Sequence, residues 1–240
     1  MTWNGRNKIG ATVLERGFTL ESGGRVVPGV YWTPVGMDAD RLVLLGHGGS
    51  ADKKADCIEL IAHGLCSLGV AAVAIDGPGH GDRPGADQFE TRPQDFAVRW
   101  ESDGGTSAIV ADWKSALDFI EHHDDARATG YLGLSMGTIM GLPVCVADER
   151  IAVAVLGLMG FWGPNKNDLV QLAPELSIPI RFLMQWDDEV VPRDRCLELF
   201  DAVGSEHKSL HTNPGTHRNV PASEVEAAVH YLASQLAEIA

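Results

Sequence analysis

The chain has 240 residues, of which 45% are hydrophobic and 22% are charged, and its formal net charge at pH 7 is −14. This length favours one large domain over residues 1–240 with a sizeable buried core. The negative charge argues against binding to nucleic acid or to anionic membranes, because both would repel the protein. We find no apolar signal-peptide core and no apolar run long enough to span a bilayer, so we expect a soluble, cytoplasmic protein.

Two kinds of strand pattern follow each other along the chain. Residues Thr12–Leu20 and Arg25–Thr33 alternate apolar and polar side chains around Glu21-Ser22-Gly23-Gly24. This pattern predicts a β-hairpin with one face in water. The later strand candidates are continuous apolar runs, which are typical of strands buried on both faces of a sheet. They lie at Arg41–Leu45, Val70–Ile75, Thr129–Leu134, Ile151–Leu158 and Ile180–Gln185, with a shorter strand around Lys208–Thr212.

Segments of helical length separate these runs, and several of them repeat apolar residues at helical spacing. Four such segments are Lys53–Ser67, Ser107–His122, Arg193–Val203 and Pro221–Ile239. Strands that alternate with helices predict an α/β fold, with a mostly parallel, twisted sheet and helices on both faces. We therefore expect an antiparallel hairpin followed by about six parallel strands.

Two connections are longer than the others, namely residues 82–105 and residues 161–177. Long connections in a compact domain are usually lids or binding loops, and a surface insertion is the alternative. The second connection is too short for a large helical cap. We therefore expect a minimal cap, with these two segments beside the pocket.

The segment Gly133-Leu134-Ser135-Met136-Gly137 has the pattern G-x-S-x-G between a predicted strand and a run of small residues. A serine in this pattern lies on a sharp turn, where a base and a substrate carbonyl can both reach it. A serine hydroxyl is a poor nucleophile without an adjacent base. That base should be a histidine oriented by a carboxylate, and both should follow later strands, because ligands gather at the carboxyl ends of parallel strands.

The chain offers both partners after Ser135, in the order serine, aspartate, histidine. The run Asp187-Asp188-Glu189 directly follows the strand that ends near Gln185, and Val191-Pro192 lead into the next helix. We expect Asp188 to be the acid, with Asp187 as its competitor. The base is expected to be His217, in a loop that contains glycine and proline and precedes the last helix.

An acyl-transfer site also needs backbone N–H groups aimed at the developing negative charge. The amide of Met136 opens a helix and is therefore free to donate. The second donor should lie in Gly46-His47-Gly48-Gly49-Ser50, after the first parallel strand. We expect the amide of Gly49, with Gly48 as the alternative. His47 is expected to fix this loop through side-chain hydrogen bonds.

Several aromatic side chains near the strand ends could form an apolar substrate pocket, with plain core packing as the alternative. The candidate pocket residues are Gly48, Phe161, Trp162, Trp186 and Trp100. No cofactor or metal is expected. The four cysteines lack C-x-x-C spacing, and His122 and His123 have no further ligand at a defined spacing.

Taken with Asp76-Gly77-Pro78-Gly79-His80-Gly81, these motifs resemble the α/β-hydrolase superfamily from about residue 12 to the C-terminus. The hexapeptide is similar to that of small serine esterases related to dienelactone hydrolases and prolyl-oligopeptidase-type domains. Dienelactone hydrolases carry a cysteine nucleophile, whereas this chain has Ser135. The resemblance implies a sheet of about eight strands with an antiparallel second strand, no cofactor and no metal.

The predicted activity is hydrolysis of carboxylic esters of small molecules through a Ser-His-Asp triad and an acyl-enzyme. The alternatives are a C–C bond hydrolase, a thioesterase or a peptidase with the same triad, because these chemistries differ mainly in the pocket. A more remote alternative is a non-catalytic ligand-binding protein of the same fold. The protein is expected to be a monomer or a homodimer.

Overall fold

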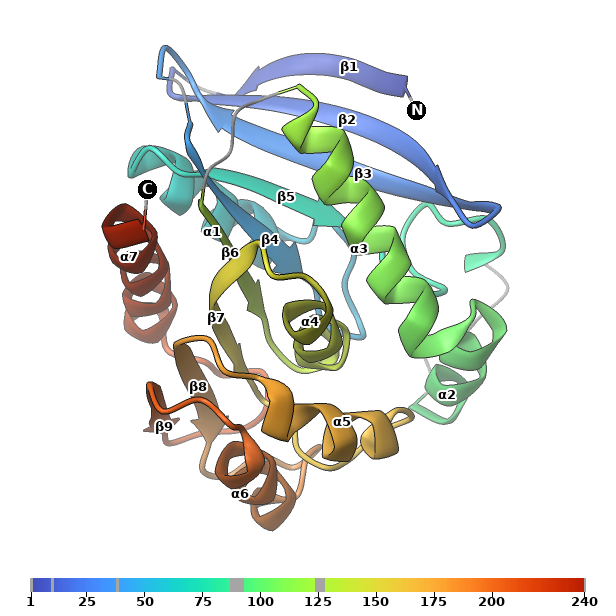
Figure 1. The fold of residues 1–240 in the computed structure, drawn as a ribbon, viewed down its shortest axis with the longest axis vertical. Helices are drawn as coiled ribbons and strands as arrows, with labels where there is room; N and C mark the ends of the chain where they lie inside the picture. The colour runs from blue at the N-terminus through green and yellow to red at the C-terminus, as the bar shows by residue number, and fades with distance from the viewer. Residues whose placement is uncertain (1, 10, 38, 87–92, 124–127, 240) are drawn as a thin grey trace.

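The computed structural model describes residues 2–9, 11–37, 39–86, 93–123 and 128–239. Within these residues the chain forms a nine-stranded sheet in the order β1-β2-β3-β5-β4-β6-β7-β8-β9 (Figure 1). The strands are β1 Thr2–Ile9, β2 Val13–Ser22, β3 Arg25–Pro34, β4 Arg41–Gly46, β5 Ala71–Ile75, β6 Ala128–Gly133, β7 Ile151–Gly157, β8 Ile180–Gln185 and β9 Lys208–Asn213.

The predicted hairpin and the six parallel strands are confirmed, but the water-exposed face expected for the hairpin is wrong for β3. Residues 27–32 of β3 are all buried, because Tyr31 packs in one buried cluster and Trp32 in the other. Strands β2 and β3 pair antiparallel with Ser22 opposite Arg25, and the turn residues Gly23 and Gly24 have positive φ angles of 55° and 79°. Such angles suit glycine, which has no Cβ to clash with the backbone. Strands β4 to β9 pair parallel throughout, and β3 joins them through antiparallel pairing with β5.

Strand β1 is the difference from the expected eight strands. Its sequence does not alternate, since Trp3 and Ile9 are its only large apolar residues. It pairs antiparallel with β2, with a register shift between Asn4 and Asn7. The Trp3 ring packs against Phe119, with their centroids 4.7 Å apart. Tertiary contacts therefore place this segment at the sheet edge, where its own pattern predicts no strand.

Helices cover both faces of the sheet, as the sequence predicted. One buried cluster lies under α1 Asp56–Ser67 and α7 Ala222–Ile239. The other lies under α3 Gly105–Glu121, α4 Met136–Ala147 and α6 Arg193–Ala202. Figure 1 shows α3 and α4 in front of the sheet and α1 behind it. No helix among the described residues is long and apolar enough to cross a membrane.

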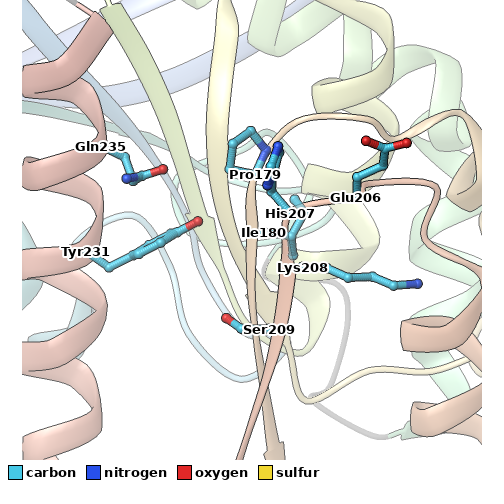
Figure 2. A pocket seen from close by; sticks show the side chains of 8 residues that line it. All are labelled: Pro179, Ile180, Glu206, His207, Lys208, Ser209, Tyr231 and Gln235. Atoms are coloured by element: carbon cyan, nitrogen blue, oxygen red, sulfur yellow. The ribbon is translucent and has the colours of Figure 1, made fainter.

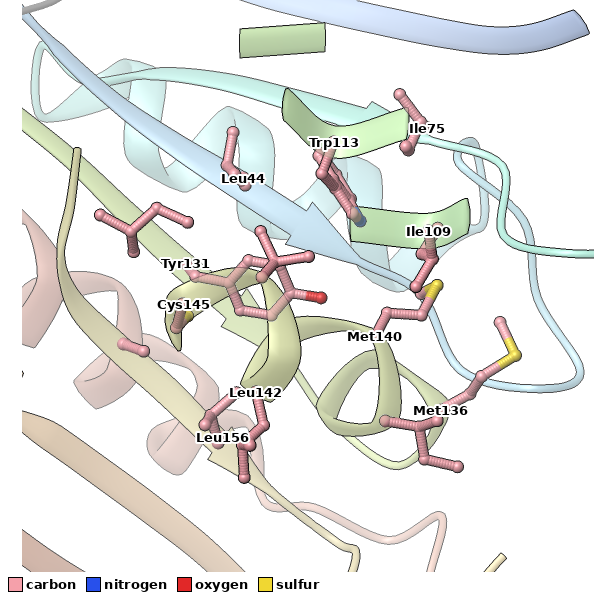
Figure 3. Packing of buried hydrophobic residues seen from close by; sticks show 14 of the residues in the cluster. Leu44, Ile75, Ile109, Trp113, Tyr131, Met136, Met140, Leu142, Cys145 and Leu156 are labelled. Carbon is pink, nitrogen blue, oxygen red and sulfur yellow. The ribbon is translucent and has the colours of Figure 1, made fainter. Parts of the chain in front are cut away.

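The core under α4 fixes this helix on the sheet (Figure 3). Tyr131 of β6 is fully buried, and its hydroxyl donates to the Gly137 carbonyl oxygen at 2.7 Å. Met140 and Leu142 of α4 pack in the same cluster, together with Leu156 of β7. The apolar residues and this one buried hydrogen bond together set the position of the first turn of α4.

The two long connections carry short helices. The described part of residues 82–105 contains α2 Pro93–Ser102, while residues 87–92 lie outside the described residues. Residues 161–177 contain α5 Lys166–Leu172 and a 3-10 turn at Ala173–Glu175. The hydroxyl of Thr106 at the start of α3 donates to the Asp168 carboxylate of α5. This hydrogen bond ties the end of the first connection to the second.

A buried ionic network links the hairpin, α3 and the loop after β5. Asp112 of α3 is 1% exposed and accepts hydrogen bonds from Arg25 and Arg83, each at 2.7 Å. Arg83 also donates to the Asp103 carboxylate at 2.9 Å and to the Asp76 carbonyl oxygen at 2.7 Å. Buried charges are tolerated when each is paired and hydrogen-bonded, as these are.

We predict that Asp112→Ala lowers the free energy of unfolding by about 3 kcal/mol or more, because it removes the buried carboxylate that both Arg25 and Arg83 bind. Asp118→Ala on the same helix is the control, since Asp118 pairs with Arg150 at a site where its side chain is 68% exposed. That change should cost less than about 1 kcal/mol. Urea unfolding of both variants tests this, and equal losses would contradict it.

Candidate active site

Ser135 lies on a strained turn between β6 and α4. Its φ of 59° and ψ of −118° are rare for a residue with a side chain. The turn is closed by small residues: a Cβ at Gly133 would lie 2.6 Å from the Gly137 carbonyl oxygen, and a Cβ at Gly137 would collide with the Gly46 carbonyl oxygen. The Ser135 amide donates to the Gly157 carbonyl oxygen at 2.9 Å. The side chain is thereby held at the carboxyl end of the sheet.

The structure brings Ser135, His217 and Asp188 together into one chain of hydrogen bonds. Ser135 Oγ lies 2.9 Å from His217 Nε2, and His217 Nδ1 lies 2.7 Å from Asp188 Oδ2. The His217 side chain is 11% exposed and that of Asp188 is 5% exposed. When Nδ1 donates to the carboxylate, the lone pair of Nε2 faces the serine hydroxyl. The arrangement can therefore remove the serine proton.

The three consecutive acids after β8 have different contacts. Asp188 Oδ1 accepts the amides of Val190 and Val191 at 2.8 Å each, which leaves Oδ2 for the imidazole. The carboxylate of Glu189 accepts the backbone amide of His217 at 2.9 Å, and this hydrogen bond lowers the pKa of Glu189. The backbone amide of Asp187 donates to the Gly215 carbonyl oxygen at 3.1 Å. Asp187, the competing candidate, therefore contacts the histidine loop but not the imidazole.

Sequence reasoning missed the contact made by Glu189. The residue was visible only as one member of an acidic run, and the pattern gives no sign that its side chain reaches the backbone of His217, 28 positions away. The spacing Asp188-x-x-Val191-Pro192 singled out the acid that contacts the imidazole. No comparable spacing marks Glu189.

The two predicted oxyanion donors lie side by side. A Cβ built on Gly49 would lie 3.9 Å from the Cβ of Met136. Met136 is the first residue of α4, and the first amides of a helix have no partner within it. Among the described residues, no atom lies within 4 Å of a Cβ placed on Gly48. Both Gly48 and Gly49 can approach a ligand closely.

His47 holds this loop through both ring nitrogens. It is fully buried, and its Nε2 accepts the Gly77 amide at 2.8 Å. The proton therefore sits on Nδ1, which donates to the Gly48 carbonyl oxygen at 2.9 Å. Burial is the main cause that lowers the pKa of His47 to about 3. At neutral pH this ring is an uncharged part of the scaffold, in agreement with the hydrogen bonds that the sequence predicted for it.

The five predicted pocket residues differ in burial and in their contacts. Trp100 is buried in the core, and Phe161 is half-buried beside that cluster. Trp162 and Trp186 are exposed, and the Trp186 ring stacks on the Arg193 guanidinium at 4.0 Å. Gly48 directly precedes Gly49, at which a Cβ would lie 3.9 Å from the Cβ of Met136. The pocket stays a prediction.

Phe96 of α2 lies closer to the loop than the predicted aromatic residues do. A Cβ built on Gly49 would lie 3.9 Å from the Phe96 ring. The same ring lies 6.4 Å from Trp100 and 6.4 Å from His80, measured between centroids. The position of Phe96 in the long connection 82–105 was the only signal in the sequence. The first connection thus places one apolar ring beside the candidate oxyanion donor Gly49.

A separate hollow of about 470 Å³ opens at the opposite edge of the sheet (Figure 2). It lies where β8 and β9 begin, beside α7, whereas Ser135, Asp188 and His217 follow the ends of their strands. Its lining residues are Pro179, Ile180, Glu206, His207, Lys208, Ser209, Tyr231 and Gln235. In the described part of the chain, no three histidine, cysteine, aspartate or glutamate side chains are grouped so that they could hold a metal ion.

The chain is similar in sequence and fold to solved structures of esterases. The chain is 51% identical to a cold-adapted esterase from an Arctic intertidal metagenomic library, with a TM-score of 0.92 over 98% of this chain and 100% of that one. It shares its fold with the acetyl xylan esterase from Paenibacillus sp. R4, at 18% identity and a TM-score of 0.73 over 97% of this chain and 88% of that one.

A curated relative covers a smaller region. The protein YtaP of Bacillus subtilis (strain 168) is 32% identical over 123 residues, which is 45% of this chain. The matched region spans only 39% of the length of that relative. The sequence model of the Alpha/beta hydrolase family matches residues 42–234, which include Ser135, Asp188 and His217. The chain therefore belongs to the alpha/beta hydrolase family.

Proposed function

We propose that this protein hydrolyses carboxylic esters of small molecules, with Ser135 as the nucleophile and His217 as the general base and acid. One observation carries the proposal: Ser135 Oγ lies 2.9 Å from His217 Nε2, while Asp188 binds the other ring nitrogen at 2.7 Å. A serine in this arrangement can lose its proton to the imidazole as it attacks a carbonyl. The identity of 51% to a cold-adapted esterase supports esters as the substrate class.

The reaction would proceed in two halves. Ser135 Oγ bonds to the ester carbonyl carbon while His217 Nε2 takes the hydroxyl proton, and the oxyanion accepts hydrogen bonds from the amides of Gly49 and Met136. The intermediate then collapses, and His217 returns the proton to the departing alkoxide. Water repeats the sequence on the acyl-enzyme, with His217 again as the base, and releases the carboxylic acid.

Asp188 acts through the imidazole. Its carboxylate keeps the ring proton on Nδ1 and stabilises the imidazolium that forms when Nε2 takes the serine proton. The His217 amide donates to the Glu189 carboxylate, and the Asp187 amide donates to the Gly215 carbonyl oxygen. These hydrogen bonds hold the loop that carries the ring. These contacts support a role for the whole acidic run in orienting one side chain.

The same machinery could act on thioesters, amides or C–C bonds, because all three reactions pass through a similar oxyanion. The similarity to an esterase favours the ester. The 2.9 Å contact between Ser135 and His217 favours an enzyme over a non-catalytic binding protein. A panel of ester, thioester, anilide and diketone substrates ranks these activities. The cytoplasmic location and the oligomeric state stay predictions from the sequence.

We predict that Ser135→Ala lowers kcat for p-nitrophenyl butyrate by about 10⁴-fold or more, because the acyl-enzyme can no longer form. The variant should unfold at or above the temperature of the parent protein. The substitution removes only the hydroxyl that contacts His217 and keeps the backbone hydrogen bond from residue 135 to Gly157. Ser107→Ala is the matched control, because Ser107 is an exposed serine on α3. Retention of more than a tenth of the activity by Ser135→Ala would overturn the proposal.

We also predict different effects for the two neighbouring aspartates. Asp188→Asn should lower kcat by about 10³-fold to 10⁴-fold, because the amide cannot hold the imidazole in the productive tautomer. Asp187→Asn should lower kcat by less than about tenfold, because the hydrogen bonds of Asp187 in the described part of the chain go to the Gly215 backbone. Initial rates at saturating ester measure both. The reverse order would show that Asp187 is the acid.

A further inference from the structure

The hexapeptide Asp76-Gly77-Pro78-Gly79-His80-Gly81 lies directly beside the loop that carries the candidate oxyanion donor Gly49. The reason is topological: β4 and β5 are parallel neighbours, so the loops that follow them meet at the same edge of the sheet. The Asp76 side chain is fully buried and accepts the backbone amide of Lys53 at 3.0 Å and its ammonium group at 2.8 Å. This fixes the far end of the oxyanion loop.

His80 contacts the middle of the same loop. It is 5% exposed, and its Nε2 lies 2.9 Å from the Gly49 carbonyl oxygen. Its Nδ1 lies 2.6 Å from the Pro78 carbonyl oxygen, so the ring is in reach of two acceptors. The turn around it is built from glycines at positive φ, 66° at Gly79 and 58° at Gly81. A Cβ at Gly81 would collide with the Asp76 carboxylate.

The two buried histidines act on the two peptide units that flank the Gly49 Cα. His47 Nδ1 binds the Gly48 carbonyl oxygen, which belongs to the same peptide unit as the Gly49 amide. His80 Nε2 lies 2.9 Å from the Gly49 carbonyl oxygen, which belongs to the next peptide unit. A glycine has an unusually soft backbone, so both of its dihedral angles need external support. The two contacts together supply that support.

We propose that His80 is a positioning residue for the oxyanion hole, donating from Nε2 to the Gly49 carbonyl and so aiming the Gly49 amide at the substrate oxyanion. This proposal rests on the proposed ester hydrolysis. It gives the hexapeptide a function beyond that of a turn: Asp76, Gly77 and His80 each hold a different point of the loop between His47 and Lys53. His80 itself never touches the substrate and acts only through Gly49.

A pair of variants separates the two contacts of the ring. The amide nitrogen of glutamine can take the place of Nε2 and donate to Gly49, whereas that of asparagine takes the place of Nδ1 and reaches only Pro78. His80→Asn should lower kcat by about 10-fold to 100-fold, a part of the 10²-fold to 10³-fold cost of losing an oxyanion donor outright. His80→Gln should retain kcat within about fivefold, because it keeps the donor that matters. KM should change by less than about threefold in both variants, since substrate binding does not use the oxyanion contact.

An inhibitor pair reports on the oxyanion directly. A trifluoromethyl ketone adds to Ser135 to give a tetrahedral oxyanion, whereas the ether analogue of the same ester has no carbonyl. In His80→Asn, the inhibition constant of the ketone should rise by about the same factor as kcat/KM falls, and that of the ether should stay within about twofold. His230→Asn is the matched control and should change neither value, because His230 is an exposed residue of α7.

Equal kcat values for His80→Asn and His80→Gln, or a loss confined to KM, would overturn the proposal. If His80→Asn fails to fold, His80→Gln decides alone, and a fall of more than tenfold in its kcat overturns the proposal. Failure of the proposed function gives a different result: Ser135→Ala then retains activity. If Ser135→Ala is inactive while His80→Asn retains full kcat, only the role of His80 is rejected.

Discussion

The close approach of β4 to the first turn of α4 is the constraint on which the rest of the site depends. Gly46 ends β4, and a Cβ at Gly137 would collide with its carbonyl oxygen, so only glycine allows the contact. The buried Tyr131 hydroxyl holds the same turn through the Gly137 carbonyl. Because the strand end and the helix start touch here, the loop after β4 is carried over the first amide of α4, and Gly49 comes to lie beside Met136.

From this contact outward, the oxyanion loop and the histidine loop are each anchored by side chains that belong to another loop. The oxyanion loop is held by His80 and Asp76 from the loop after β5, and the histidine loop is held by Asp187 and Glu189 from the loop after β8. Loops rich in glycine would otherwise be flexible, because a glycine restricts its own backbone very little. Anchoring from outside makes such a loop rigid and still leaves its amides free.

The sequence predicted the parts of this structure that local rules control. Continuous apolar runs located β4 to β8, and the glycine pair after Ser22 located the hairpin turn, because both signals depend on residues next to each other. Strand β1 was missed because its pairing with β2 and the packing of Trp3 on Phe119 come from distant residues. A pattern read along the chain carries no information on such contacts.

The same limit explains the outcome at the site. Ser135, Asp188 and His217 could be chosen from motifs, and the structure brings all three side chains together. The aromatic residues could not be sorted, since an apolar ring is equally suited to a core and to a pocket: Trp100 lies in the core, and Phe96, one turn earlier on α2, lies beside Gly49. Only the register of α2 against the oxyanion loop separates the two rings.

The site combines a strained backbone at Ser135 with buried ion pairs in neighbouring loops. Ser135 has an unfavourable backbone conformation that persists only because its surroundings determine it. The loops after β4 and β5 bury several charged side chains: Lys53 binds the Asp76 carboxylate, and Arg83 binds the Asp76 carbonyl oxygen and the Asp112 carboxylate. Ion pairs of this kind contribute little net stability, but they have a single satisfactory arrangement, and breaking one costs several kcal/mol. These pairs therefore resist any shift of the loops after β4 and β5 that would separate a buried charge from its partner.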